Sequence, residues 1–296
     1  MLPWLASYQH QLAELVTRAK LAHGLLLTGP QGIGKQYLAE HLAALLLCPV
    51  SNKPCGQCKS CLLRLAGNHP DLLVIDSSNA SIGVDAIRQL GQFMAGRAQQ
   101  QANKVVLLAE ADKLTEAAAN ALLKTLEEPP QHSFIILHSA RPDTLAPTLI
   151  SRCQRWHIAA QYDDSAQQWL QAQTNRAVPD FLLEYCAGAP LKALSLLESG
   201  EAEHIQLSFS ALDEFFADTL SLSKLLKQLE NLTELRALLG WYLRRTLLPA
   251  HSSNGAKTLA LHQLYSRWCR DETQILGQNK ALALSALLTA LKKLAG

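Results

Sequence analysis

A glycine-rich segment near the start of the chain has the residue types and spacing that hold a phosphate group. Residues 29–36 read Gly-Pro-Gln-Gly-Ile-Gly-Lys-Gln and lie between an apolar run and a helical pattern. Glycines let the backbone curl so that its N–H groups face phosphate oxygens, while the lysine reaches the terminal phosphates. We therefore predict a nucleotide-binding P-loop formed by Gly29, Gly32, Gly34 and Lys35, with a ligand-free strand-to-helix turn as the alternative.

The residues that normally hold magnesium beside such a loop are altered in this sequence. The last position of the motif is Gln36 instead of a serine or threonine, whose hydroxyl would bind the ion. In the following motif strand Ala109 stands where an acidic residue is expected, so that Glu110 and Asp112 could replace it only imperfectly. Because magnesium neutralises charge during phosphoryl transfer, we expect weak or absent hydrolysis, whereas binding of ATP or ADP stays open.

A second group of chemically capable residues is a cluster of cysteines. Cys48, Cys55, Cys58 and Cys61 follow the spacing C-x6-C-x2-C-x2-C. Four thiolates complete a tetrahedral zinc shell, and the two tight C-x2-C steps can fold around one ion. The cluster contains no general acid or base, so we predict a structural zinc site. Four free thiols and an iron–sulfur cluster are the alternatives. The C-x2-C-x2-C-x3-C-P arrangement of bacterial ferredoxins is absent, which makes the iron–sulfur cluster the weaker of these alternatives.

The elements that must position these residues alternate between strands and helices. Apolar runs predict strands at 24–28, 72–76, 104–109, 134–137 and 156–158, and helical patterns lie at 34–47, 84–95 and 116–127. Three of the runs are almost wholly apolar, as expected for strands covered on both faces. Such alternation is typical of a parallel sheet between helices, so we predict a five-stranded α/β domain with helices on both faces.

The pattern changes from strands and helices to helices alone after about residue 160. The preceding helix at 116–127 has clear ends, because Thr115 can cap its start and Pro129-Pro130 prevents its continuation. We predict an α/β domain over 1–160 with the cysteine insertion at about 48–61. A small helical domain over 161–203 and a helical C-terminal domain over 204–296 complete the expected organisation.

Composition limits the partners and the compartment of the protein. A formal net charge of +2 argues against a strongly basic coat for nucleic acid, although a local patch would be compatible with it. The apolar runs are too short to cross a membrane, and the first residues lack the pattern of a signal peptide. We therefore expect a cytoplasmic protein whose cysteines stay reduced and which has no membrane partner.

Several stretches together resemble the clamp-loader subunits of the AAA+ class. The resemblance rests on residues 118–130 (Ala-Ala-Asn-Ala-Leu-Leu-Lys-Thr-Leu-Glu-Glu-Pro-Pro), on Ser151-Arg152-Cys153, on the cysteine cluster and on His69-Pro-Asp71. It covers the first domain and the following small helical domain, whereas the last third agrees in helical character and length only. The resemblance implies a P-loop AAA+ domain, a small helical lid and a helical collar through which subunits associate.

The resemblance also implies a division of labour between subunits. A clamp loader is a ring of five AAA+ subunits, including gamma/tau motor subunits and a delta subunit. It opens the sliding clamp and places it on primed DNA without reading sequence. Each ATP site lies between neighbours, and the resemblance implies that Arg152 is an arginine finger that acts on the site of the next subunit. A structural salt bridge is the alternative role for this side chain.

Further departures favour a non-motor subunit over an ATP-hydrolysing gamma/tau-type subunit. The family's lid helix carries an arginine that senses the γ-phosphate, and the matching position here is Leu191, with Lys192 beside it. The segment His138–Ala140 also lacks the usual Thr or Asn sensor at an assignable place. A gamma/tau-type motor remains the alternative, and a P-loop small-molecule kinase is remote because it leaves Ser-Arg-Cys unexplained.

Two arginines and one histidine carry weaker predictions. Arg88 and Arg97 flank a helix that in clamp loaders tends to line the DNA chamber, so they could meet phosphates, but a solvated helix face explains them equally well. His69 precedes a proline at a turn into a strand, which indicates a structural role instead of a fifth metal ligand.

Overall fold

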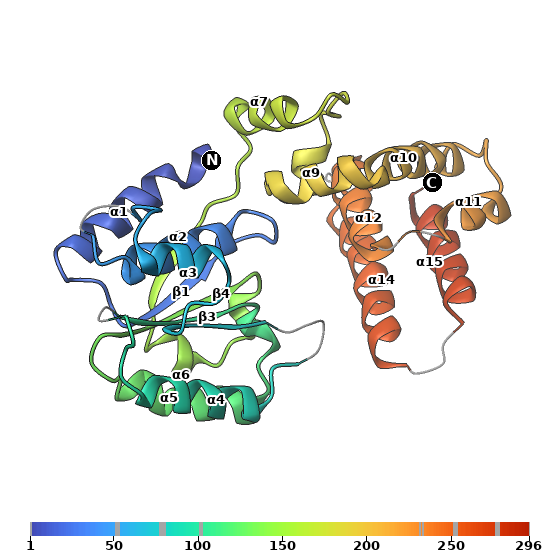
Figure 1. Cartoon of the computed structure of the whole chain (residues 1–296). Coiled ribbons are helices and arrows are strands. Elements are labelled where there is room, and N and C mark those ends of the chain that lie inside the picture. Colours follow the sequence, from blue (N-terminus) through green and yellow to red (C-terminus); the bar gives the residue numbers. More distant parts are fainter. Residues whose placement is uncertain are drawn as a thin grey trace. The chain divides into compact units, whose positions relative to one another are not determined.

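The computed structural model describes residues 2–50, 54–76, 81–100, 103–230, 232, 234–250, 254–275 and 279–295. The chain divides into two compact units, which are shown in Figure 1. The first comprises Met1–Ala172 with Cys186–Lys192, and the second comprises Gln173–Tyr185 with Ala193–Gly296. The separate lid domain expected over 161–203 stays a prediction, because this division assigns parts of that range to both units.

The first unit is built on a parallel sheet of five strands. The strands are β1 (Gly24–Thr28), β2 (Leu72–Ile75), β3 (Lys104–Leu108), β4 (Ser133–Ser139) and β5 (Gln154–His157), in the order β2-β3-β4-β1-β5. This confirms the predicted sheet. Strand β5 begins two residues earlier than predicted, because Gln154 already pairs with Leu25 of β1. Strands β1 and β3 are buried along their whole length, as their apolar composition indicated.

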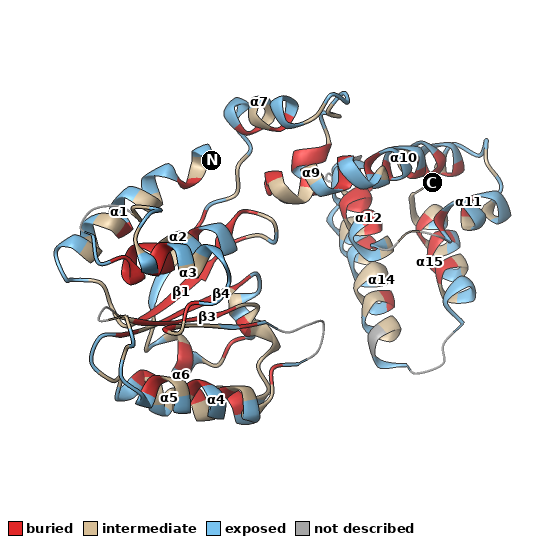
Figure 2. Ribbon diagram, in the orientation of Figure 1, coloured by how far each residue is buried: buried red, intermediate tan, exposed pale blue. Residues whose placement is uncertain are grey.

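Helices cover both faces of this sheet, as Figures 1 and 2 show. Because side chains alternate along a strand, Leu25 and Leu27 of β1 pack on one face and Leu26 on the other. The first face carries η1 (Pro3–Leu5), α1 (Ala6–Thr17) and α2 (Lys35–Leu47), and the second carries α4 (Val84–Ala95), α5 (Glu116–Glu127) and α6 (Pro147–Ile150). The unit also contains η2 (Ala111–Lys113), α3 (Lys59–Leu65), η3 (Pro142–Thr144) and most of α7 (Asp164–Gln173).

The described part of the second unit is helical. Its helices are α8 (Leu182–Tyr185), α10 (Glu201–Phe216), α11 (Leu222–Leu229), α12 (Leu235–Tyr242), the π-helix η4 (Leu243–Leu247), α13 (Leu248–Ala250), α14 (Gly255–Gln274) and α15 (Lys280–Ala295). Helix α9 (Pro190–Ser199) crosses the boundary between the units. Phe209, Trp241 and Tyr242 stack in the interior, where Trp241 and Tyr242 are buried. This helical character agrees with the helical C-terminal domain predicted over 204–296.

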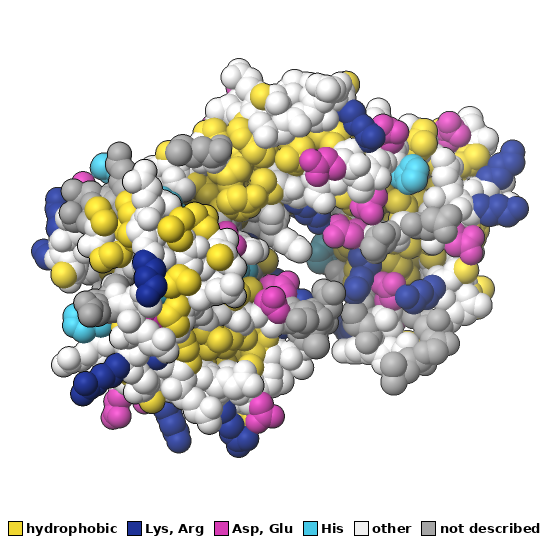
Figure 3. Space-filling view, in the orientation of Figure 1, with side chains coloured by type: hydrophobic (Ala, Val, Ile, Leu, Met, Phe, Trp, Pro, Cys, Tyr) yellow, Lys and Arg dark blue, Asp and Glu magenta, His cyan; other side chains and the backbone are white. Residues whose placement is uncertain are grey.

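The face of the structure drawn in Figure 3 carries charges of both signs. In Figure 3 basic and acidic side chains are interspersed on the visible face instead of being separated by sign. Among the described residues, no helix combines the length and the apolar character needed to cross a membrane.

Substitution of Thr115 tests the predicted start of α5. The Oγ1 atom of Thr115 accepts a hydrogen bond from the backbone N–H of Ala118 at 3.2 Å. We expect Thr115→Ala to lower the free energy of unfolding by about 1 kcal/mol, because the helix loses its capping acceptor. Urea denaturation measures the change, and Thr115→Ser, which keeps the hydroxyl, is the control. An unchanged midpoint for Thr115→Ala would show that the cap contributes nothing to stability.

Candidate functional site

The predicted P-loop lies between the carboxyl end of β1 and the start of α2. Gly29, Gly32 and Gly34 have φ values of +144°, +82° and +102°, which residues with a side chain rarely adopt. The loop therefore depends on glycine at these three positions. The Nζ atom of Lys35 donates hydrogen bonds to the carbonyls of Gly29 and Pro30, each at 2.8 Å. The structure thus brings the four predicted P-loop residues together.

Two segments distant in the sequence pack against this loop. Leu191 donates its backbone N–H to the carbonyl of Gly32 at 3.1 Å, so the start of α9 lies directly against the loop. A Cβ atom at Gly32 would lie 2.6 Å from the backbone nitrogen of Lys192, which leaves room only for glycine. On the N-terminal side, the Nε1 atom of Trp4 donates to the carbonyl of Ile33 at 2.8 Å. The position matched to the family's phosphate sensor therefore reaches the P-loop, but it carries the apolar side chain of Leu191.

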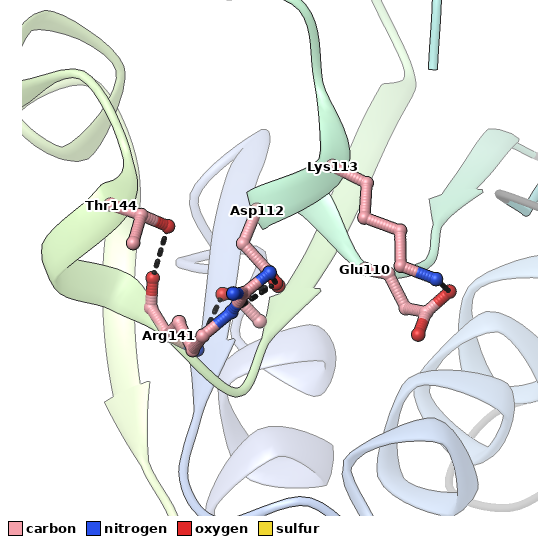
Figure 4. A network of polar contacts seen from close by, with 6 residues as sticks. Glu110, Asp112, Lys113, Arg141 and Thr144 are labelled. Atoms are coloured by element: carbon pink, nitrogen blue, oxygen red, sulfur yellow. Dashed lines mark hydrogen bonds and ion pairs between the residues drawn. The ribbon is translucent and has the colours of Figure 1, made fainter. Parts of the chain in front are cut away.

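The acidic residues beside the P-loop are engaged by other side chains, as Figure 4 shows. Asp112 accepts hydrogen bonds from the Oγ atom of Ser139 at 2.7 Å and from Nε and Nη2 of Arg141 at 3.0 and 2.9 Å. Burial acts to raise the pKa of Asp112, but these hydrogen bonds outweigh it and hold the pKa below its usual range. Glu110 pairs with Lys113 at 2.9 Å. A metal ion would have to compete with these partners.

Arg141 was missed by the sequence analysis, although a signal for it was present. Asp112 follows β3 and Arg141 follows β4, and these neighbouring strands are parallel. Carboxyl ends of neighbouring parallel strands lie at one edge of the sheet, so opposite charges placed there meet.

Lys35 and His138 have pKa values that are shifted by their surroundings. Burial lowers the pKa of Lys35 to about 8, and the negative charge of Asp112 partly opposes this shift. Burial, together with the charge of Lys35, lowers the pKa of His138 to about 4. At neutral pH the lysine is therefore charged and the histidine neutral. The pair can present one cation to a phosphate, but His138 adds no second charge.

Arg152 lies near the amino ends of β1 and β5, whereas the P-loop follows the carboxyl end of β1. It precedes β5 by two residues, and its carbonyl oxygen would lie 3.3 Å from a Cβ atom at Gly24, the first residue of β1. Its guanidinium donates to the carbonyl of Thr148 at 2.8 Å and forms an ion pair with Glu127. Arg152 is half-buried, and the structure does not bring it to the P-loop of its own chain.

The four predicted cysteine ligands come together around one point. Their sulfur atoms all lie within 4.8 Å of one another, and the Cys48–Cys58 and Cys55–Cys61 pairs are each 3.9 Å apart. Tetrahedral zinc with Zn–S bonds of about 2.3 Å would place sulfur atoms roughly 3.8 Å apart, so the cluster fits this ion. Backbone N–H groups of Gln57 and Cys58 donate to the Cys55 sulfur and lower the pKa of that thiol to about 6, whereas burial raises the pKa of the Cys61 thiol to about 12. The cluster can therefore hold zinc.

A buried polar network fixes α3, which contains Cys61 and is capped by Cys58, to the end of α2 and to the segment before β2. His69 accepts at Nδ1 from the backbone N–H of Asp71 at 3.0 Å, so its proton is on Nε2, which lies 2.7 Å from the Ser60 hydroxyl. Ser60 in turn donates to the carbonyl of Leu47 at 2.7 Å. Burial lowers the pKa of His69, in keeping with a neutral ring. Both ring nitrogens are thus occupied within the protein, which supports the structural role expected for His69.

The basic residues expected near DNA show a local partner. Arg88 pairs with Asp85 at 2.9 Å, and both side chains are largely exposed. This contact is typical of a solvated helix face, so a DNA contact of Arg88 or Arg97 stays a prediction.

Comparison with known proteins identifies the family. The family described as "DNA polymerase III, delta subunit" matches residues 5–161, more than half of the chain. The chain belongs to this family. Proteins named DNA polymerase III subunit delta′ from Haemophilus influenzae and Pseudomonas aeruginosa are 38% and 42% identical to it over 205 and 212 residues. These alignments cover 68% of this chain in both cases, and 63% and 62% of the relatives.

The family match confirms what residues 118–130 and Ser151–Cys153 indicated. The chain spans about three-fifths of the length of its delta′ relatives, including the one from Escherichia coli, which is 36% identical. Among solved structures, a DNA polymerase III gamma subunit-related protein from Thermotoga maritima has a TM-score of 0.53 and 19% identity. It covers 97% of this chain and 100% of its own. This likeness shows that the two share a fold.

Metal analysis tests the cysteine cluster of this DNA polymerase III family member. We expect about one zinc ion per purified chain and a clear loss of zinc in Cys58→Ser, because three thiolates leave the tetrahedral shell open. Atomic emission measures the metal content, with Cys269→Ser as a control outside the cluster. Iron with visible absorbance would contradict the prediction, as would a wild-type protein free of metal after preparation without chelators.

Acidification tests the neutral state of His138. Its folded pKa of about 4 lies below the ordinary value of 6.5, so the unfolded chain takes up a proton that the folded protein excludes. The resulting stability is complete above pH 6.5 and is lost as the pH falls towards 4, which amounts to about 2 kcal/mol at pH 5. We expect His138→Gln to lose less stability between pH 7 and pH 5 than the wild type in urea titrations.

The exposed His262 supplies the control for this experiment. His262→Gln makes the same substitution at this exposed position and is measured in the same urea titrations. If His138→Gln and His262→Gln respond alike, the neutral state of His138 does not contribute to the pH dependence.

Proposed function

We propose that this chain is a non-motor subunit of the delta′ type in a bacterial clamp loader, the AAA+ ring that places the sliding clamp on primed DNA. In this role it lends Arg152 to the ATP site of a neighbouring subunit and hydrolyses little or no ATP itself. The family match and the relatives named DNA polymerase III subunit delta′ support this assignment.

The observation that carries the proposal is the distance between Arg152 and the P-loop of the same chain. Arg152 lies near Gly24 at the amino end of β1, whereas Lys35 follows its carboxyl end. At roughly 3.3 Å per residue, β1 spans about 16 Å, which exceeds the length of an arginine side chain. Arg152 is therefore too far away to act on its own P-loop, which supports an action on a phosphate of an adjacent subunit.

The surroundings of the P-loop support weak or absent hydrolysis in this chain. Both oxygens of Asp112 accept hydrogen bonds from neighbouring side chains, and Glu110 is paired with Lys113. Gln36 and Ala109 offer neither of the ligands that usually hold magnesium. Lys35 and the glycines could still accept the phosphates of ATP or ADP. Without a well-held magnesium ion, the charge that develops during hydrolysis would be poorly neutralised.

Zinc and the partner subunits complete the proposed role. Cys48, Cys55, Cys58 and Cys61 would hold one zinc ion, which closes the insertion after α2 and takes no part in the reaction. The partners we propose are gamma/tau and delta subunits in a ring of five, the sliding clamp, and primer–template DNA held through phosphates.

A gamma/tau-type motor is the competing function. The intact Lys35 favours it, as does 36% identity over 148 residues to DNA polymerase III subunit tau from Bacillus subtilis, which covers 49% of this chain. Steady-state ATP hydrolysis by the isolated chain separates the two functions. Turnover that disappears in Lys35→Ala would identify a motor and exclude the non-motor assignment.

Replacement of Arg152 tests the proposed action on a neighbour. In a ring reconstituted with motor and delta subunits, Arg152→Ala should slow hydrolysis at the adjacent site roughly 10³-fold, because the γ-phosphate loses a stabilising cation. The total DNA-stimulated rate of ATP hydrolysis by the ring then falls by the fraction that the adjacent site contributes. Arg155→Ala removes the same charge three residues along and is expected to keep the wild-type rate.

Two outcomes would contradict the proposed function. One is a chain that fails to assemble with motor and delta subunits. The other is an assembled ring in which Arg152→Ala hydrolyses ATP as fast as Arg155→Ala does.

A further inference from the structure

In this chain the guanidinium of Arg152 is held by two groups at helix ends. One terminal nitrogen donates to the carbonyl of Thr148 at 2.8 Å, within the short helix α6. The other forms an ion pair with the carboxylate of Glu127, the last residue of α5. The side chain is thus folded back onto its own domain, with its charge matched by a carboxylate.

The position of Glu127 relative to Arg152 is fixed by packing at the start of β1. The Nε2 atom of His23 lies 2.8 Å from the carbonyl of Leu126, which ties the end of α5 to the sheet. A Cβ atom at Gly24 would lie 2.9 Å from the Leu126 side chain and 3.3 Å from the Arg152 carbonyl. Glycine therefore allows both segments to approach the strand closely. The backbone holds Glu127 within reach of Arg152 whether or not the ion pair is formed.

The ion pair is placed so that it can be broken. The side chains of Arg152 and Glu127 are 35% and 47% exposed, and water-exposed pairs of this kind bias an equilibrium by only a factor of about two to five. In addition, Glu127 stands at the carboxyl end of α5, where the helix dipole disfavours a negative charge. A phosphate, which carries more charge than a carboxylate, would compete effectively for the guanidinium.

We propose that Glu127 stores Arg152 in the free subunit and yields it to a nucleotide phosphate on the neighbouring subunit. This inference rests on the proposed role of Arg152 as an arginine finger. While the pair is intact, the guanidinium presents little net charge to a neighbour, so an interface without nucleotide gains nothing from it. When the neighbour carries a nucleotide, the phosphate replaces Glu127, and Arg152 contributes to the interface.

The test compares Glu127→Gln with Glu128→Gln, which removes the same charge from the next, exposed position. The full chain is titrated with motor subunit, with the delta subunit present, in ATPγS and in the absence of nucleotide. With ATPγS, Glu127→Gln should assemble at a two- to five-fold lower motor-subunit concentration than the wild type, because no competing carboxylate remains. Without nucleotide it should match the wild type, and Glu128→Gln should match it in both conditions.

A second measurement examines storage in the free subunit directly. Selective ¹⁵N labelling of arginine reports the rotation of each guanidinium by NMR. The Arg152 signal should show hindered rotation in the wild type and in Glu128→Gln, and faster rotation in Glu127→Gln. Freely rotating Arg152 in the wild type would overturn the proposal.

The assembly titration separates the failure of this inference from that of the proposed function. If Arg152→Ala assembles and hydrolyses ATP like the wild type, Arg152 is not an arginine finger and both ideas fail. If Arg152→Ala is impaired but Glu127→Gln behaves like Glu128→Gln or assembles less readily, only the proposed storage of Arg152 by Glu127 is wrong. The proposed function then stands.

Discussion

The hydrogen-bonded pairing of β1 between β4 and β5 is the interaction on which the other features of the first unit depend. Leu25, Leu26 and Leu27 are fully buried and pack on both faces of the sheet, so the strand is held from four sides. Its carboxyl end delivers the glycines of the P-loop, and its amino end lies against the segment that carries Arg152. Because all five strands run in parallel, these two groups are kept at opposite edges of one rigid layer.

This separation gives the two edges different chemistry. At the carboxyl edge, Lys35 interacts electrostatically with Asp112, whose carboxylate is also bound by Arg141, and Glu110 is paired with Lys113. At the amino edge, a half-exposed guanidinium is held by a half-exposed carboxylate. Ion pairs in contact with water exchange partners at little cost, whereas more buried ones resist it. The carboxylate of Asp112 is 8% exposed, so its ion pair costs more to break than the pair of Arg152 with Glu127, whose side chains are 35% and 47% exposed.

Much of the fold could be predicted from the sequence because its signals are local. The apolar run at 24–28 and the helices at 84–95 and 116–127 have the predicted bounds, since strand periodicity and caps such as Thr115 act within a few residues. The end of the sheet was harder to predict. Strand β5 has a mixed pattern, and its first residue is determined by pairing with Leu25, a residue far away in the sequence. Local periodicity carries no information about such a partner.

The candidate sites divide in the same way. The sequence by itself determined which residues form the P-loop and the cysteine cluster, because glycine spacing and C-x2-C steps restrict the backbone over a few residues. Only the tertiary structure decided three contacts: the hydrogen bonds of Arg141 to Asp112 and of Leu191 to Gly32, and the ion pair of Glu127 with Arg152. Each of these contacts joins residues at least 25 positions apart in the printed sequence. Their formation depends on strand order and helix packing, which no short segment encodes alone.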